Sequence, residues 1–284
     1  MKISAWRHFV SRLFLPYLPL AVVLFILLFP FYWMVLTSFK SMAEIFDYTH
    51  SPLWIRTPLL DNYKFLFENN VAFGQWSVNS IIVAVLTTAF SLIVSIAAGY
   101  AIARLRFRGA TLFGVLIFIS YLVPKTLLFI PLAQLLRQIH MLGNLSALAL
   151  VYPTFLIPFC AWLLTGYFRT VPIDPEECAM IDGCSRLGAA IRITLPMAVP
   201  GVLTAGIFAF TLSWNELLYA LAFVSGEANK TLPVGLINSL AQRDFFNWGP
   251  LMAGATLGSI PVMLVYFFFM DLYVSGLTAG AVKG

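Results

Sequence analysis

The residues with the clearest capacity to bind a partner lie together in one polar segment, residues 174–196. Three acids, Asp174, Glu176 and Glu177, stand beside Pro175 at its start. Acids suit the first turn of a helix because they complement the positive end of its dipole, and proline suits it because no partner for a backbone N–H is needed there. We predict a short helix with Asp174 as N-cap and Glu177 in a capping box.

Gly183 is predicted to end this helix as a left-handed C-cap and to form an elbow. A second short helix is predicted over about residues 186–192, running toward Leu195 and Pro196. A small apolar ridge on the two helices is predicted from Ala179, Met180, Leu187 and Ile191. A ridge that projects from a polar segment is best explained by a groove in another protein. Residues 174–196 are therefore named the docking segment.

Covalent and metal chemistry have little support in the sequence. The three cysteines are Cys160, Cys178 and Cys184, and the histidines are His8, His50 and His140. Their spacing matches no metal site, so we interpret the cysteines as structural. The sequence also lacks an H-E-x-x-H motif and a G-x-x-x-x-G-K-[ST] phosphate loop. We expect a chain that is not an enzyme and that holds neither a metal nor a cofactor.

The composition requires lipid as the solvent of most of the surface. The 284 residues are 61% hydrophobic and only 10% charged, with a mean hydropathy of +0.90. A soluble domain carries about 25% charged residues. A bilayer core takes roughly 20 apolar residues in helical form. Six stretches fit, namely residues 14–38, 73–103, 111–132, 145–168, 197–224 and 249–273. We predict an all-α integral membrane protein with six transmembrane helices.

Loop charges predict the orientation. The short loop between the second and third stretches contains Arg104, Arg106 and Arg108, and short basic loops stay in the cytoplasm. Both termini are then cytoplasmic, and the net charge of +5 gives no reason to expect nucleic acid. The predicted organisation is a cytoplasmic N-terminus at 1–13, a membrane domain at 14–274 and a cytoplasmic tail at 275–284. Within the membrane domain, 40–72 and 225–248 are extracytoplasmic and 169–196 is a cytoplasmic loop.

The first stretch is interpreted as a retained helix, because its apolar run is too long for a signal peptide. The two extracytoplasmic segments are candidate contact surfaces, although simple connecting loops would have a similar composition.

The docking segment resembles the EAA loop of ABC importer permeases. That family pattern is Glu-Ala-Ala, three residues, Gly, nine residues, Ile, one residue, Leu-Pro. Here Glu177, Gly183, Ile193, Leu195 and Pro196 stand at those positions, with Ala179 as the third letter. The departure is Cys178, which replaces an alanine with another small residue.

Further blocks narrow the resemblance to carbohydrate-importer permeases of the smaller maltose-permease type. These blocks are Ile181-Asp182-Gly183, Trp214-Asn215-Glu216, Thr231-Leu232-Pro233-Val234-Gly235 and residues 276–284. The resemblance implies a type I importer permease in a bacterial or archaeal cytoplasmic membrane. It also implies four kinds of partner besides membrane lipid: a second permease chain, an ABC ATPase dimer that holds ATP and Mg, an extracytoplasmic solute-binding protein, and a carbohydrate.

Two sets of site residues follow from this resemblance. The ATPase-coupling set is Glu176, Glu177, Ala179, Met180, Asp182, Gly183, Leu187, Ile193, Leu195 and Pro196, with Glu177 and Asp182 as anchors. Polar groups inside apolar stretches are costly in lipid and indicate function. The substrate-path candidates are therefore Asn79, Lys125, Trp214, Asn215 and Glu216. We favour Asn215 or Glu216 facing the path, with a helix–helix hydrogen bond as the alternative. Lys125 either reaches outward to the interface or lines the path, and we favour the first.

An ion-gradient-driven transporter is the alternative function. It predicts buried ionisable relays and an internal repeat, for which the sequence gives little sign. A membrane-embedded enzyme has no catalytic grouping to support it.

Overall fold

The structure, a computed structural model, describes residues 2–68, 71–105, 107–242 and 245–278. Side chains are described for the parts of these ranges outside residues 2–16, 239, 241–246 and 271–278. The chain divides into two compact units. The first comprises Met1–Val71 with Leu236–Gly258, and the second comprises Ala72–Gly235 with Ser259–Gly284.

The first unit contains a long helix and a small cap of loops. Its elements are α1 (Lys2–Ser38), α2 (Met42–Ile45), α3 (Asp61–Glu68), the end of α14 (Leu232–Leu240), β1 (Ala241–Gln242), β2 (Phe245–Phe246) and the start of α15 (Trp248–Thr278). The two short strands pair antiparallel. The side-chain amide of Asn62 donates to the carbonyls of Ser38 and Lys40, each at 2.8 Å, and so fixes the chain where α1 ends.

The cap holds a polar cluster beside an exposed aromatic residue. Asp47 accepts hydrogen bonds from the hydroxyl and amide of Thr49, and these bonds lower the pKa of the Asp47 carboxyl to about 2. A cavity of about 220 Å³ lies there, with Trp54 at its rim. Helices α2 and α3 give residues 40–72 secondary structure of their own.

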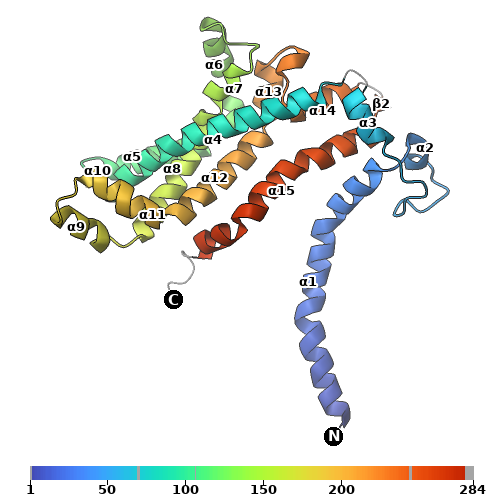
Figure 1. The fold of residues 1–284 in the computed structure, drawn as a ribbon, viewed down its shortest axis with the longest axis horizontal. Coiled ribbons are helices and arrows are strands. Elements are labelled where there is room, and N and C mark those ends of the chain that lie inside the picture. Colours follow the sequence, from blue (N-terminus) through green and yellow to red (C-terminus); the bar gives the residue numbers. More distant parts are fainter. Residues whose placement is uncertain (1, 69–70, 106, 243–244, 279–284) are drawn as a thin grey trace. The chain divides into compact units, whose positions relative to one another are not determined.

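The second unit is a bundle of membrane-length helices. Its elements are α4 (Phe73–Arg104), α5 (Ala110–Leu122), α6 (Lys125–Gln138), α7 (Ser146–Val151), α8 (Pro153–Thr170), α9 (Asp174–Ile181), α10 (Arg186–Ala189), the π-helix η1 (Ala190–Thr194), α11 (Leu195–Met197), α12 (Val199–Trp214), α13 (Leu218–Phe223), the 3₁₀ turn η2 (Glu227–Asn229), the start of α14 and the remainder of α15. Helix α4 packs along α8 and α12, and α5 packs along α8. Figure 1 shows α9, α10 and α11 at one end of this bundle and α6, α7 and α13 at the other.

Small side chains let the central helices approach closely. Ser91, Ser95 and Gly99 of α4 are buried, and a Cβ added at Gly99 would lie 3.1 Å from the Cβ of Leu164 on α8. Small residues at helix contacts are typical of membrane bundles, where packing replaces the hydrophobic effect. Leu164 belongs to the core of this unit together with Leu156, Cys160 and Phe168. Cys160 is therefore a core residue, as the sequence predicted.

Among the described residues, four helices are long and apolar enough to cross a membrane, and two bent helix pairs would raise the number to six. One bent pair is α5 and α6, which meet at 93°. The third predicted stretch, 111–132, is therefore formed by two helices with a sharp bend between them. Val123 adopts an extended conformation before Pro124, as residues before proline prefer, and this ends α5.

Candidate functional site

The first helix of the docking segment begins one position earlier than the sequence suggested. Ile173 is the capping residue, and its carbonyl accepts from the amides of Glu176 and Glu177 at 3.0 and 3.1 Å. Asp174 is therefore the first helical residue, and the N-cap and capping box predicted for Asp174 and Glu177 are wrong. Because Ile173 already has helical dihedral angles, its carbonyl accepts the hydrogen bonds that form the first turn of α9. The acids still lie at the positive end of the helix dipole.

The predicted elbow at Gly183 is confirmed. Gly183 has φ +94°, a left-handed conformation that favours glycine. Its amide donates to the carbonyl of Met180 at 3.2 Å, and the amide of Cys184 donates to Ala179 at 3.0 Å. These two bonds form a Schellman motif, which satisfies carbonyls that the end of α9 leaves open.

The second helical piece is longer than predicted. Ser185 caps it by accepting from the amide of Gly188 at 3.1 Å. Helix α10, η1 and α11 then continue through Ile193 and Leu195 to Met197, past the predicted end at residue 192. The Ser185 cap was missed, although a serine directly before a helical run is a usual start signal.

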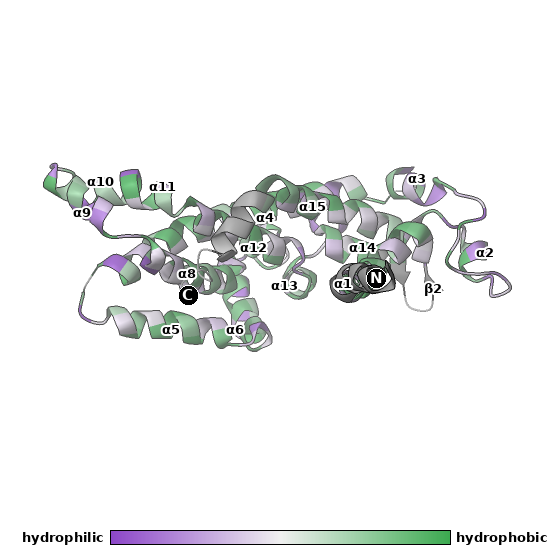
Figure 2. Ribbon diagram, turned by 90° about the horizontal axis from the view of Figure 1, so that it is seen from below, coloured by the Kyte–Doolittle hydropathy of each residue, from purple (hydrophilic) through white to green (hydrophobic). Residues whose placement is uncertain are grey.

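The apolar ridge differs in membership from the prediction. Leu187 and Ile191 are exposed, at 70% and 55%, and Ile181 is exposed at 84%. Ala179 and Met180 are half-buried instead. The acids Glu177 and Asp182 are both exposed and available to a partner. Figure 2 shows hydrophilic colour on α9, whereas α5 of the same unit is mostly hydrophobic.

Glu176 is the buried acid of the docking segment, with only 4% of its surface exposed. Its carboxylate accepts hydrogen bonds from the hydroxyl of Tyr100 on α4 at 2.5 Å and from the hydroxyl of Thr194 on η1 at 2.7 Å. Arg104 Nε of α4 lies 3.7 Å from Glu176 Oε2. The sequence placed Glu176 among the coupling residues but named Glu177 and Asp182 as anchors. The carboxylate of Glu176 thus joins three elements.

Arg104 extends this connection to the start of the segment. Its guanidinium donates to the carbonyl of Val171 at 2.5 Å. A polar cavity of about 310 Å³ opens beside it, lined by Arg104, Ile173, Glu176, Glu177, Met180 and Arg186. The docking segment therefore carries a charged hollow next to its exposed apolar side chains.

The fifth predicted membrane helix is interrupted where Glu216 stands. Helix α12 ends at Trp214, so the stretch predicted over 197–224 is not one unbroken helix. The Glu216 carboxylate is 6% exposed and accepts from the amides of Tyr219 and Ala220, both at 3.1 Å, which starts α13. The hydroxyl of Tyr152 donates to it at 3.0 Å. Glu216 therefore bonds to Tyr152, which stands between α7 and α8, and its role in the substrate path stays a prediction.

Trp214 and Asn215 differ in exposure. The Trp214 ring is buried and stacks on Phe210 with centroids 5.9 Å apart. Asn215 is exposed and donates to the carbonyl of Thr211 at 3.0 Å. Of the Trp214–Glu216 group, only Asn215 is exposed.

Lys125 lies at the bend between α5 and α6. Its ammonium stands 3.9 Å from the centroid of the Phe155 ring, a cation–π contact. Its carbonyl accepts from the hydroxyl of Tyr219 at 2.7 Å. The structure therefore attaches Lys125 to aromatic side chains of α8 and α13.

Asn79 holds a loop against α4. Its amide donates to the carbonyls of Ala228 and Lys230 at 2.8 and 2.9 Å. Its carbonyl oxygen accepts from Gln75 at 2.9 Å. The neighbouring Ser80 hydroxyl accepts from the amide of Leu232 at 2.8 Å. Residues 226–232, named the far segment, are thus held by α4.

The structure explains why the block Thr231-Leu232-Pro233-Val234-Gly235 ends in glycine. A Cβ at this position would lie 2.1 Å from the Trp76 ring, a distance that real side chains do not tolerate. The indole of Trp76 in turn donates to the carbonyl of Glu227 at 3.2 Å. Glycine is required at 235 because the α4 tryptophan packs directly on the backbone.

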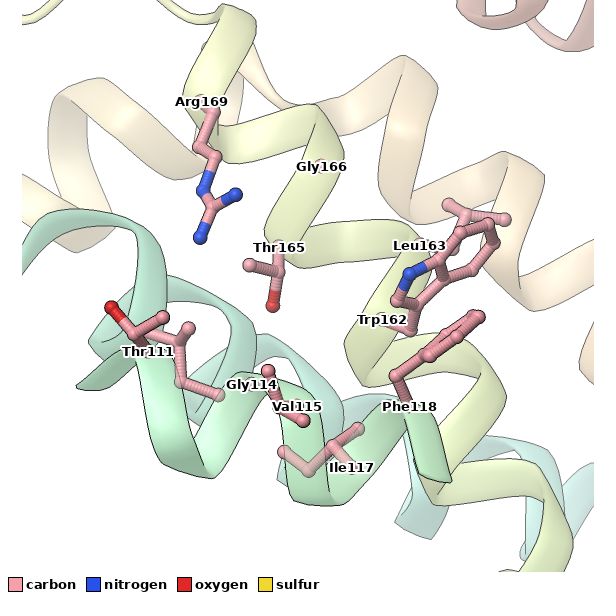
Figure 3. Close-up of a pocket in the computed structure, with 11 residues that line it drawn as sticks. Thr111, Gly114, Val115, Ile117, Phe118, Trp162, Leu163, Thr165, Gly166 and Arg169 are labelled. Carbon is pink, nitrogen blue, oxygen red and sulfur yellow. The ribbon is translucent and has the colours of Figure 1, made fainter. Parts of the chain in front are cut away.

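A groove of about 510 Å³ lies between α5 and α8. Figure 3 shows the Arg169 guanidinium extending from α8 toward Thr165 and Thr111, with Trp162 and Phe118 farther along. The lining is mainly apolar. Within the described part of the chain, no group of three or more His, Cys, Asp or Glu residues could hold a metal ion.

These observations define a multi-pass membrane protein with a polar docking segment between two helices of its bundle. The family described as "Binding-protein-dependent transport system inner membrane component" matches residues 91–278. The chain belongs to this family of ABC transporter permeases.

Curated relatives cover nearly its whole length. The sulfoquinovosyl glycerol transport system permease protein SmoH of Agrobacterium fabrum is 39% identical over 90% of this chain and 89% of its own. The diacetylchitobiose uptake system permease protein DasC of Streptomyces coelicolor is 37% identical over 93% and 95%. The trehalose/maltose transport system permease protein MalG of Thermococcus litoralis is 33% identical over 91% and 92%.

A solved structure supports the fold. A chain of a bacterial ABC transporter involved in the import of the acidic polysaccharide alginate superposes with a TM-score of 0.78 at 21% identity. The match covers 93% of this chain and 97% of that one. The type I importer permease fold predicted from the sequence is therefore confirmed.

Proposed function

We propose that this chain forms, with a second related permease chain, the membrane path for a carbohydrate or carbohydrate derivative. An extracytoplasmic binding protein delivers the solute, and a pair of ATPase subunits supplies the energy through the docking segment. The observation that carries the proposal is the capped helix, elbow and second helix at 174–196, with Ile181, Leu187 and Ile191 exposed. Exposed apolar side chains beside a charged hollow suit a groove in another protein.

The carbohydrate class is supported by the relatives. Each of the three named above transports a sugar or a sugar derivative by its name. They differ in the solute that each name gives.

The proposed orientation places the docking segment and both termini in the cytoplasm. Basic residues are enriched in cytoplasmic loops of membrane proteins. Five arginines lie in the docking segment or in the loops and helix ends on the same predicted side of the membrane: Arg104, Arg108, Arg169, Arg186 and Arg192. ATP and Mg then belong to the partner ATPase, and this chain contributes no catalytic group and holds no cofactor.

Among the five substrate-path candidates, Asn215 keeps the strongest claim to a solute contact because its side chain is exposed at the end of α12. Asn79 and Glu216 have their polar atoms engaged by backbone groups of this chain. These two side chains shape the path rather than bind its cargo.

The test is transport in vesicles that contain this chain, its second permease and its ATPase subunits. Loaded binding protein outside and ATP inside should give uptake of a labelled carbohydrate that persists when ionophores collapse ion gradients. Uptake that needs an ion gradient and proceeds without the ATPase subunits would overturn the proposal in favour of a secondary transporter.

A further inference from the structure

Helix α4 is an uninterrupted helix that reaches from the docking segment to the far segment. It has 32 residues and is therefore about 48 Å long at 1.5 Å per residue. Beside it, α5 ends at Leu122 and α12 ends at Trp214. A stiff helix that is attached at both ends transmits a displacement from one end to the other. Whether α4 can do so depends on the contacts at its two ends.

At the docking end the attachment is the Glu176 carboxylate. Tyr100 and Arg104 of α4 reach it from one side, and Thr194 of η1 reaches it from the other. Arg104 also binds the Val171 carbonyl just before α9. Separating α9 from α4 would leave a buried charge without its partner, which is strongly unfavourable. The docking segment and this end of α4 therefore move as one body.

At the opposite end the attachment is made to backbone groups of the far segment. Trp76 donates to Glu227, Asn79 donates to Ala228 and Lys230, and Ser80 accepts from Leu232. These bonds join residues about 150 positions apart in sequence, as Asn79 and Lys230 illustrate with a separation of 151. Side chains of α4 thus determine where this backbone lies.

We propose that Glu176 is a positioning residue that fastens the docking segment to α4, and that α4 carries displacements of the docking segment to the far segment. The inference rests on the proposed function, in which an ATPase moves the docking segment. In the proposed orientation the far segment faces the binding protein. The nucleotide state of the ATPase therefore changes the surface that the binding protein meets.

The experiment compares variants of the complete transporter with its second permease and ATPase subunits in lipid nanodiscs and proteoliposomes. Glu176→Gln removes the charge at the docking end. Asn79→Ala removes two of the four hydrogen bonds described at the far end, away from the docking segment that the ATPase is proposed to bind. Ser77→Ala is the matched control, because among the described residues its hydroxyl bonds the Phe73 carbonyl within α4 and no group of the far segment. Hydrogen exchange of peptides covering 226–232 is measured with and without ATP and vanadate.

In the wild type, exchange of the far segment should change when nucleotide is trapped. In Glu176→Gln this nucleotide-dependent change should disappear, and in Asn79→Ala it should shrink, because Trp76 and Ser80 keep their bonds to the far segment. Uptake should fall about tenfold or more, in the range of measured allosteric couplings. The ATPase subunits should still copurify and hydrolyse ATP. Ser77→Ala should behave as the wild type does.

Three results would overturn the inference. The first is that hydrogen exchange of the far segment in the wild type is the same with and without trapped nucleotide. The second is normal uptake with Glu176→Gln. The third is loss of the ATPase subunits from that variant, which would make Glu176 a docking contact instead. If Glu176→Gln fails to reach the membrane, Tyr100→Phe tests the same attachment by removing one hydrogen bond, and normal nucleotide-dependent exchange there would refute it. Failure of the wild-type chain to copurify with any ATPase would refute the proposed function itself.

Discussion

Two buried glutamates, Glu176 and Glu216, lie in the same bundle and are held in different ways. Glu176 is bound by side chains of two other elements, including the guanidinium of Arg104. Glu216 is bound by backbone amides of the helix that it starts and by the Tyr152 hydroxyl. The first carboxylate is held by side chains of other elements alone, whereas the second mainly caps the start of α13. The burial of an acid in a membrane bundle therefore does not reveal its role until its partners are known.

Two glycines, Gly183 and Gly235, likewise have different structural reasons for being glycine. Gly183 has a left-handed backbone and open space where a Cβ would be, whereas Gly235 lies against the Trp76 ring. The first glycine is required by a dihedral angle, and the second is required by close packing.

The largest effect is expected for Gly235→Val. The new side chain would collide with Trp76, and overpacking of this severity costs about 3 kcal/mol or more. Thermal unfolding of the purified chain in detergent should show a large drop in stability or no folded protein. A double variant with Trp76→Ala should recover part of the loss, and no recovery would show that packing on Trp76 is not the reason for the glycine.

A smaller loss is expected for Glu216→Ala. It removes the acceptor for the Tyr219 and Ala220 amides and leaves the Tyr152 hydroxyl without its partner, a cost of about 2 kcal/mol. Glu216→Gln keeps an acceptor oxygen and should lose less in the same unfolding measurement. Equal stability of Glu216→Ala and the wild type, together with loss of solute binding, would return Glu216 to the role of a substrate contact.

Gly183→Asp should cost about 1–2 kcal/mol at most, because only the left-handed backbone is penalised. Its functional effect should be greater than its structural one. The variant should reach the membrane and yet uncouple ATP hydrolysis from uptake, since the elbow sets the angle between the helices of the docking segment. Uptake assays with parallel ATPase assays measure this, and normal uptake would count against the docking segment as the coupling element.

The smallest effect is expected for Ser185→Ala. Loss of the N-cap bond to Gly188 should cost about 1 kcal/mol and loosen α10 locally. Faster hydrogen exchange of residues 186–190 should accompany nearly unchanged stability of the bundle. Unchanged exchange there would mean that α10 is held by its packing rather than by its cap.

Local signals in the sequence were sufficient for much of the docking segment. The elbow at Gly183 was predictable because a helix C-cap depends on a few neighbouring residues. Glu176 and Glu177 were not separable in this way, since the partners of Glu176 are Tyr100 and Thr194, 76 and 18 positions away. The bond between Glu216 and Tyr152 was not predictable for the same reason, because Tyr152 is 64 positions distant.

For the membrane helices, too, some features were predictable from the sequence and others were not. Apolar runs predicted which segments enter the bilayer, because hydropathy is a property of the stretch itself. The positions of the breaks at Val123 and Trp214 were harder to predict, since hydropathy alone placed each of these stretches in one span. Pro124 was a visible signal for the first break, whereas the second depends on the carboxylate of Glu216 starting a new helix.

The central claim is that the docking segment binds an ATPase, and the native Cys178 allows a direct test. Its side chain is exposed in the middle of α9, so a photo-activated cross-linker can be attached there in the complete transporter. With Cys184 replaced by alanine, the claim predicts a cross-linked product between this chain and the ATPase subunit that is absent from Cys178→Ser. Efficient labelling of Cys178 with no product to the ATPase, or with products to membrane subunits alone, would contradict it.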